Sequence, residues 1–521
     1  MPASDAIPNK ILFLVTGLAG SLLVNLSAQF VSTNAADIQA GVFASADEAS
    51  WLSTVYTMTG FVGIATSGVL IRALGIGRYL AVSALIFGTT ALACAAGPAL
   101  ETMIGLRAVQ GFAAGGFGPA AFVAIFMTAK GPLLSPVLAV FASVLLIPST
   151  HGPIISAFVE DTFGWNALYL VQAAIGATLA VAALAFAPRP RSDWSALKTD
   201  WVAILLLSTS LAAAVLVVTQ GTRRFWFESA MIVWFTAASI GAMAGYVFIA
   251  RFSPVRIMIH RMLITRDFGL SIWLNLVFRA GLVVTAYLVP QFLVATQGYR
   301  PNELAETAMW AVVPQALAPL LAWRLMQHLD ARLVVGLGLG LCALGAALVI
   351  HGTSRFAGDQ FALTLVVFSV GQILFLTPIL VFGASFLKPE QLPTASIAFN
   401  MSTLGGTALG IGLLSNFVTE REKFHSNIIT QSVSLYDSAH VDRIASLTDI
   451  VAGRMTDDVI ARAQAIGRLA SAVRREAWVL AYNDAFLVVA ILLAISLLGV
   501  VAMGGTAPLA RRQSTLSGER L

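Results

Sequence analysis

Charged side chains are scarce in this sequence. Only 11% of its 521 residues are Asp, Glu, Lys or Arg, whereas soluble domains typically carry about a quarter. Hydrophobic residues make up 58% of the chain, and the mean hydropathy is +0.84. This composition excludes an ordinary soluble domain and predicts a chain embedded in a lipid bilayer. We attribute the net charge of +5 to membrane topology rather than to nucleic-acid binding.

Patterns that bind cofactors are also missing. The two cysteines, Cys94 and Cys342, lie in apolar runs, where a buried thiol stays protonated and unreactive. No metal-ligand spacing is present. The glycine clusters at 111–118 and 336–340 lack the strand–loop–helix context of a phosphate-binding loop. We therefore expect no metal site, no cofactor and no ATP-driven step.

Two other functional classes are disfavoured. A membrane-embedded enzyme needs a nucleophile, a base and an acid at one depth, but His151 has no carboxylate near it in the sequence. A channel needs a pore-lining ring, which nothing in the pattern suggests. We expect a protein that is not an enzyme and that uses an ion or substrate gradient.

Apolar runs long enough to cross a bilayer recur fourteen times. About 20 residues are needed, because a helix rises 1.5 Å per residue. The first run is too long for a signal peptide and is expected to be retained. We predict an all-α polytopic membrane protein with spans at 11–33, 51–71, 79–98, 103–127, 133–158, 165–187, 201–219, 227–250, 268–295, 306–326, 333–352, 361–386, 394–417 and 478–503.

Lys and Arg are distributed unevenly between the connecting segments. With fourteen spans, both termini lie on one side, and the segments on that side hold sixteen Lys and Arg residues. The short segments on the other side hold only four, namely Arg223, Arg224, Arg300 and Arg355. Because positive residues are retained inside, we predict cytoplasmic termini.

Two segments differ from the spans. Residues 253–267 have an apolar face, which predicts an amphipathic helix on the cytoplasmic membrane surface. The long 418–477 segment is polar and faces outward, and its end at 457–477 is helix-like. It is either a solvated helical hairpin or an element that docks a partner.

Several motifs resemble the major facilitator superfamily, and more narrowly its fourteen-span drug:proton antiporter branch. Three lie in the first half of the chain: GVLIRALGIGR at 68–78, RAVQG at 107–111 and HGPIISA at 151–157. Motifs similar to those of the fourteen-span branch are SWLSTVY, YLVPQFL, LGGTALG, TEREKFHSNI and LAYNDAF. Their order and placement, from about residue 20 to 505, carry the resemblance.

The resemblance implies a particular organisation. A six-helix bundle would span 1–188, and a linker at 189–267 would hold two extra spans. A second six-helix bundle would span 268–505, followed by a cytoplasmic tail at 506–521. Substrate would bind near the midplane and be exposed alternately to either side.

The resemblance also implies a function. We expect a multi-pass protein of the bacterial inner membrane that exports small organic compounds or drugs in exchange for protons. An importer of organic anions or metabolites with the same fold is the alternative. The outer segment 418–477 resembles that of branch members that act with a periplasmic adaptor protein.

The resemblance assigns roles to further residues. Coupling and conformational change would involve Arg107, Gln110, Asp37 and His151. The gating motifs would include Gly68, Arg72, Gly75, Arg78, Gly111, Gly152 and Pro153. The sequence departs from the branch at three positions: Gln29 replaces an Asp, Arg72 stands at a usual Asp, and Ser402 replaces an Arg.

Polar residues form one stripe on the first span of each half. Asn25, Gln29 and Thr33 repeat every four residues, as do Ser271, Asn275 and Arg279, so each set shares a helix face. We expect these six residues to line a substrate cavity together with Asn400. No Asp or Glu lies near the middle of a span, which favours an anionic, zwitterionic or neutral substrate.

Structural roles remain as alternatives for three of these residues. Arg107 could be held by backbone carbonyls or by Gln110. Arg279 could belong to an ion pair, and His151 could be a neutral core residue. The cluster at 111–118 is expected to be a close-packing device, because Gly111 and Gly115 are four residues apart.

Overall fold

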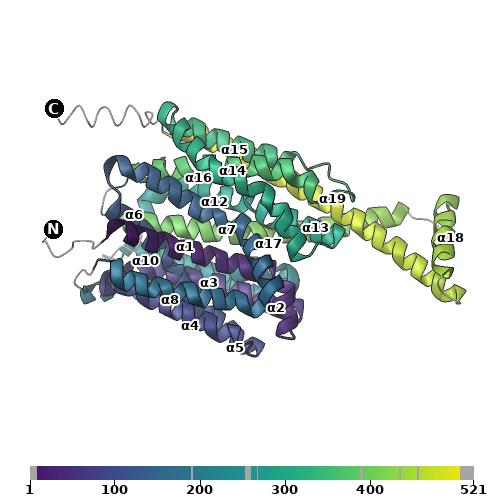
Figure 1. Ribbon diagram of the computed structural model, residues 1–521, viewed down its shortest axis with the longest axis horizontal. Helices are drawn as coiled ribbons and strands as arrows, with labels where there is room; N and C mark the ends of the chain where they lie inside the picture. Colours follow the sequence, from purple (N-terminus) through teal and green to yellow (C-terminus); the bar gives the residue numbers. More distant parts are fainter. Residues whose placement is uncertain are drawn as a thin grey trace.

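The computed structural model describes residues 9–188, 192–252, 260–266, 268–385, 387, 391–432, 436–453 and 457–504. These residues are nearly all helical and form one bundle of long helices with an arm at one end (Figure 1). Most of the predicted surface helix at 253–267 and the whole tail at 506–521 lie outside the described residues.

The first half of the chain supplies six spans. They are α1 (Lys10–Thr33), α3 (Ala46–Leu74), α4 (Ile76–Ala95), α5 with α6 (Leu100–Gly115 and Phe117–Thr128), α7 (Leu134–Phe163) and α8 (Trp165–Phe186). A short α2 (Ala35–Gly41) follows α1. Local signals set the ends: Ser45 and Glu48 form a capping box at the start of α3, and Gly75 ends it with φ 83°.

The inserted pair and the second half supply eight more spans. They are α9 (Trp201–Gln220), α10 (Ala230–Phe252), α12 with η5 and α13 (Phe268–Gly281, Val284–Leu288 and Val289–Gln297), α14 (Pro301–His328), α15 (Ala331–Ala347), α16 (Ala362–Ser385), α17 (Leu392–Ser432) and α19 (Asp458–Ala502). The shorter elements are η1 (Gly131–Leu133), η2 (Trp194–Leu197), η3 (Thr222–Arg224), η4 (Trp226–Glu228), α11 (His260–Leu263), η6 (Gly358–Phe361) and α18 (Ser438–Ala452).

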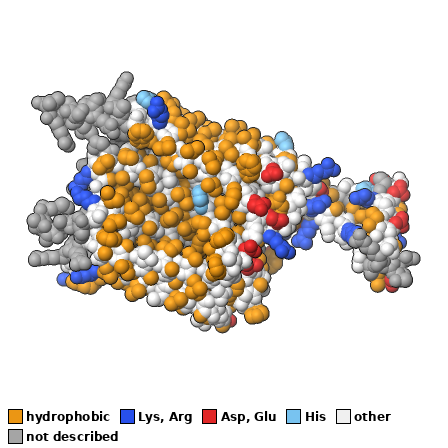
Figure 2. Space-filling view, in the orientation of Figure 1, with side chains coloured by type: hydrophobic (Ala, Val, Ile, Leu, Met, Phe, Trp, Pro, Cys, Tyr) orange, Lys and Arg blue, Asp and Glu red, His pale blue; other side chains and the backbone are white. Residues whose placement is uncertain are grey.

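Each of the fourteen predicted spans coincides with a helix. Thirteen are long and apolar enough to cross a membrane by length and composition. The remaining one, α15, has 17 residues. In Figure 2 hydrophobic side chains cover the middle of the bundle, and Asp and Glu gather near the end that carries the arm.

The arm is built from helices that continue out of the bundle. α17 runs on to Ser432 and α19 begins at Asp458, with α18 between them at the tip (Figure 1). Both helices continue beyond the predicted ends of these spans, at 417 and 478, into the polar segment without a break. The predicted helix at 457–477 is confirmed.

Three sets of contacts join the parts of the bundle. α7 packs against α14 and α16, and α17 packs against α3 and α6. The inserted α9 packs against both α3 and α17, and α10 packs against α9. The inserted pair therefore touches one helix of each half.

Candidate functional site

Arg107 is a fully buried cation held by neutral groups. Its side chain is 1% exposed. Nη1 donates to Oε1 of Gln110 at 2.6 Å and to Oγ of Ser27 at 3.3 Å, and Nε donates to the carbonyl of Leu52 at 3.4 Å. The guanidinium lies 4.0 Å from the ring centroid of Tyr56, a favourable cation–π geometry. A buried charge is costly unless hydrogen bonds replace its hydration, and here amide, hydroxyl and aromatic groups do so.

Gln172 on α8 organises the partners of Arg107. Its Oε1 accepts from Ser27 at 2.7 Å and from Gln110 at 3.3 Å, and its Nε2 donates to the carbonyl of Leu168 at 3.2 Å. The network thus joins the first, second, fourth and sixth spans. Sequence reasoning identified Arg107 and Gln110 but missed Ser27, Tyr56 and Gln172, because a single Gln or Ser in an apolar helix is not a distinctive signal.

Arg279 on α12 is also buried, but no described residue forms a hydrogen bond with its guanidinium group. It is 3% exposed, and its Nε and Nη2 make no hydrogen bond. Its Cβ lies against α17, where a Cβ added to Gly406 would be 2.7 Å away. Among the described residues no carboxylate forms an ion pair with Arg279.

The two polar stripes have different neighbours. Asn275 donates to Ser402 at 2.8 Å and to Thr403 at 3.1 Å, both on α17, while its Oδ1 is buried without a partner. On α1, Asn25 donates to the carbonyl of Ser21 at 2.8 Å. Among the described residues no hydrogen bond joins one stripe to the other, so a shared cavity stays a prediction.

Three further residues of the predicted site lie at helix contacts or ends. Gln29 lies beside α7, since a Cβ on Gly152 would be 2.7 Å from its Cβ. Asn400 lies between the halves, since its Oδ1 would be 2.0 Å from a Cβ on Gly118. Thr33 is the last residue of α1.

A small pocket opens between the halves near the start of α12. Its walls are mainly apolar and aromatic and include Phe122, Phe268 and Phe399. Ser271 also lines it. The pocket therefore contains the first residue of the stripe that leads to Arg279 two turns further along α12.

His151 is close to a hydrogen bond between the halves. Its Nδ1 lies 2.9 Å from Oγ1 of Thr150 and 3.3 Å from the carbonyl of Ile147. Thr150 donates across the interface to Oε1 of Gln315 on α14. α7 stays helical through Gly152 and Pro153. Asp37 lies in the first turn of α2 and takes no part in the Arg107 network.

Four of the predicted gating residues, Gly68, Arg72, Gly75 and Arg78, lie where α3 meets α4. Arg72 folds back so that Nε donates to the carbonyl of Gly68 at 3.2 Å. Arg78 donates to Oγ of Ser192 at 2.8 Å, and the amide of Asp193 donates to the carbonyl of Arg72 at 3.3 Å. The loop is therefore fastened to the segment that follows α8.

Glycines bring α5 close to α3, in keeping with the prediction that the cluster at 111–118 is a close-packing device. A Cβ on Gly111 would lie 2.3 Å from the carbonyl oxygen of Tyr56, and one on Gly115 would lie 2.2 Å from that of Gly60. Neither position has room for a larger residue. This close approach also brings Tyr56 and Leu52 within reach of Arg107.

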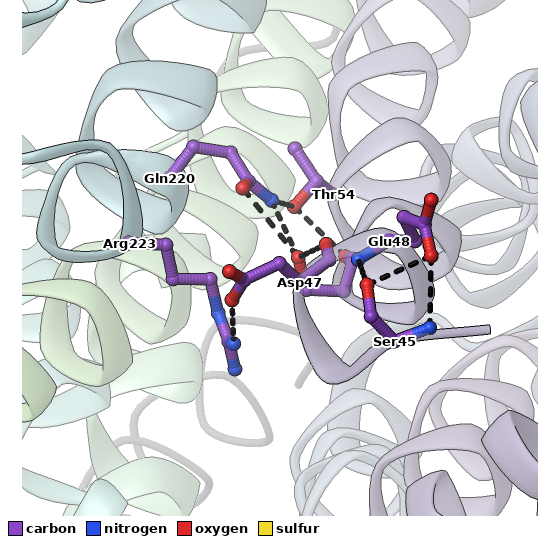
Figure 3. Close-up of polar contacts among 7 residues, drawn as sticks. Ser45, Asp47, Glu48, Thr54, Gln220 and Arg223 are labelled. Carbon is purple, nitrogen blue, oxygen red and sulfur yellow. Dashed lines mark hydrogen bonds and ion pairs between the residues drawn. The ribbon is translucent and has the colours of Figure 1, made fainter.

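The inserted pair is fastened to α3 by polar contacts near the arm end of the bundle. Arg223 donates to Asp47 at 2.7 Å, and Gln220 donates to Ser50 at 3.0 Å and to Thr54 at 2.8 Å. Figure 3 shows Gln220 and Arg223 reaching the first turns of α3. Sequence reasoning missed this cluster, whose members are more than 160 residues apart in the chain.

Comparison with known proteins establishes the family. The protein-family model described as Major Facilitator Superfamily matches residues 11–411. The chain therefore belongs to this family. The chain is 24% identical over 434 residues to the Colistin resistance protein EmrB of Acinetobacter baumannii, covering 82% of this chain and 84% of that protein. It is 22% identical over 407 residues to the Multidrug export protein EmrB of Escherichia coli K12, covering 75% and 77%.

Solved structures agree on the fold. The human organic anion transporter MFSD10 (TETRAN) matches with a TM-score of 0.54 and 13% identity, covering 93% of this chain and all of that one. A structure described as one of the proton dependent oligopeptide transporters matches with a TM-score of 0.57 and 14% identity, covering 97% of this chain and 100% of that one. The protein therefore has the major facilitator fold.

Proposed function

We propose that this protein is a secondary active exporter of drugs or other small organic compounds, driven by protons. The observation that carries this proposal is the similarity to proteins named for multidrug export and resistance along 75–82% of the chain. The two packed halves support alternating access, because transporters of this architecture expose a central site by rocking one half against the other.

The Arg107 network supports a role in coupling. A fixed cation lowers the free energy of an ionised acid near it and can also order a relay water. Here the cation is joined to three other spans by a network of hydrogen bonds. A change in its surroundings would therefore alter contacts between several spans of the first half. His151 next to the Thr150–Gln315 contact is the second candidate in this role.

We also propose a location and a partner. The distribution of Lys and Arg supports a bacterial inner-membrane protein with cytoplasmic termini. The arm would then project into the periplasm. Its exposed apolar side chains include Tyr436, Ile450 and Val459, which is consistent with an adaptor protein that binds there.

An export assay tests the proposal. Everted membrane vesicles that contain the protein should accumulate a drug when a proton gradient is applied, and a protonophore should abolish this. Deleting the gene should make cells more sensitive to the same drug. Proton-driven movement out of everted vesicles, with unchanged sensitivity of cells, would instead favour the importer.

A further inference from the structure

The guanidinium group of Arg279 forms no hydrogen bond with the residues that the structure describes. Its Nε and Nη2 are fully buried without a partner, and an N–H bond of each points to the same side of the planar group. A carboxylate pairs with two such parallel N–H groups in a bidentate arrangement. Nε and Nη2 together supply the pair that this arrangement requires.

The buried environment of Arg279 makes unpaired N–H groups energetically unfavourable. Arg279 is 3% exposed, so water cannot freely hydrate the two N–H groups, and an unpaired buried charge is costly. Neighbouring groups do not compensate: Asn275 directs its amide N–H groups to α17. Gly406 allows α17 to lie directly against Arg279, so the arginine is enclosed by helices of the second half.

The same helix face continues to the small pocket. Ser271 lines that pocket beside Phe122, Phe268 and Phe399, and it precedes Arg279 by eight residues, or just over two turns. An aromatic acid that entered between the halves would meet an apolar surface first and the arginine further along the face. Asn275 lies between them and offers an unpaired oxygen to a donor group.

We propose that the Nε–Nη2 edge of Arg279 binds the carboxylate of an aromatic or other lipophilic organic acid during transport. The inference rests on the proposed function, since it assigns the substrate class of the same transporter. It also gives Arg279 a role in selectivity: the charge favours acids over neutral compounds of the same shape and disfavours cations.

The test compares an aromatic acid with its uncharged amide analogue. Binding of 2-naphthoate and 2-naphthamide to the purified full-length protein in nanodiscs is measured by calorimetry. The wild-type protein should bind the acid more tightly. Arg279→Met should weaken acid binding by about tenfold or more, the range of charged hydrogen bonds, and should leave amide binding unchanged.

Two further variants sharpen the test. Arg279→Lys keeps the charge but not the planar fork, so it should recover only part of the preference. Arg324→Met removes an exposed arginine on α14 and should behave like the wild type. Thermal unfolding without ligand checks the fold, and Arg279→Met should be at least as stable as the wild type because it removes an unpaired buried charge.

The outcomes are separable from those of the export assay. If the wild-type protein binds the acid no better than the amide, or if Arg279→Met keeps the preference, the carboxylate site is wrong. That holds whether or not the protein exports drugs. If everted vesicles show no proton-driven export but the wild-type protein still binds the acid more tightly than the amide, only the proposed function is contradicted.

Discussion

The indole N–H of Trp226 donates to the side-chain oxygen of Asn416 at 2.7 Å. Trp226 lies between α9 and α10, and Asn416 belongs to α17 of the second half. Thr222 donates to the same oxygen at 3.2 Å. The α9–α10 connection is also bonded to α3 of the first half through Arg223 and Asp47. It therefore bridges the two halves near the arm end of the bundle.

This bridge predicts different effects for two cross-links. More polar contacts join the inserted pair to α3 than to α17, so we expect the pair to move with the first half. A cross-link between Cys residues at Thr222→Cys and Asn416→Cys should then stop transport. The matched pair Thr54→Cys and Thr219→Cys, whose hydroxyl oxygens are 3.3 Å apart, should be tolerated.

Transport by the two cross-linked proteins is measured in vesicles before and after reduction of the bond. Recovery on reduction distinguishes arrest from misfolding. Arrest by the 54–219 bond and tolerance of the 222–416 bond would show that the pair moves with the second half instead.

Arg107 should be required for transport but not for membrane insertion. Arg107→Lys loses the planar group that reaches Ser27, Gln110 and Leu52 together, so we expect transport to fall by about tenfold or more, as in Arg107→Ala. Normal transport by the Arg107→Ala variant would show that Arg107 has only a structural role. Size-exclusion profiles of the solubilised variants report insertion and folding.

Gln172 should affect transport through the partners of Arg107. Gln172→Leu removes the acceptor of two buried donors, and a buried donor without an acceptor costs about 1–3 kcal/mol. We expect reduced transport and lower thermal stability, with partial recovery in Gln172→Asn. Thr178→Val, at an exposed position of the same helix, is the control, and an equal loss in this variant would argue against a specific role for Gln172.

The topology predicts which cysteines can be labelled from outside. Both native cysteines are buried, so single introduced cysteines can be followed. In intact spheroplasts Ser446→Cys on α18 should react with an impermeant thiol reagent, and Ser195→Cys should react only after the membrane is broken. The reverse pattern would overturn the predicted orientation.

The arm should be needed in cells but not in vesicles. Replacing 430–470 by a short flexible linker removes α18 and the exposed ends of α17 and α19 without touching the bundle. If the arm binds an adaptor, vesicle transport should persist while whole-cell resistance is lost. Equal loss of vesicle transport and of whole-cell resistance would indicate instead that the arm is needed for folding.

The sequence by itself determined the helices, because membrane spanning depends on local properties. A bilayer requires about 20 apolar residues in a row, and all fourteen such runs are helices. The scarcity of mid-span carboxylates and the positions of Arg107 and Arg279 could also be found from local sequence. The end of α17 could not, because a helix that leaves the membrane changes its composition but not its hydrogen bonding.

The tertiary structure alone decided what these residues contact. Ser27 and Gln172 are 145 residues apart in the chain and share a hydrogen bond, and Asn416 meets Trp226 across 190 residues. Helical periodicity places a side chain on a face of its helix but does not say which helix covers that face. Packing therefore surrounded Arg107 with neutral partners and left the guanidinium group of Arg279 without a partner among the described residues.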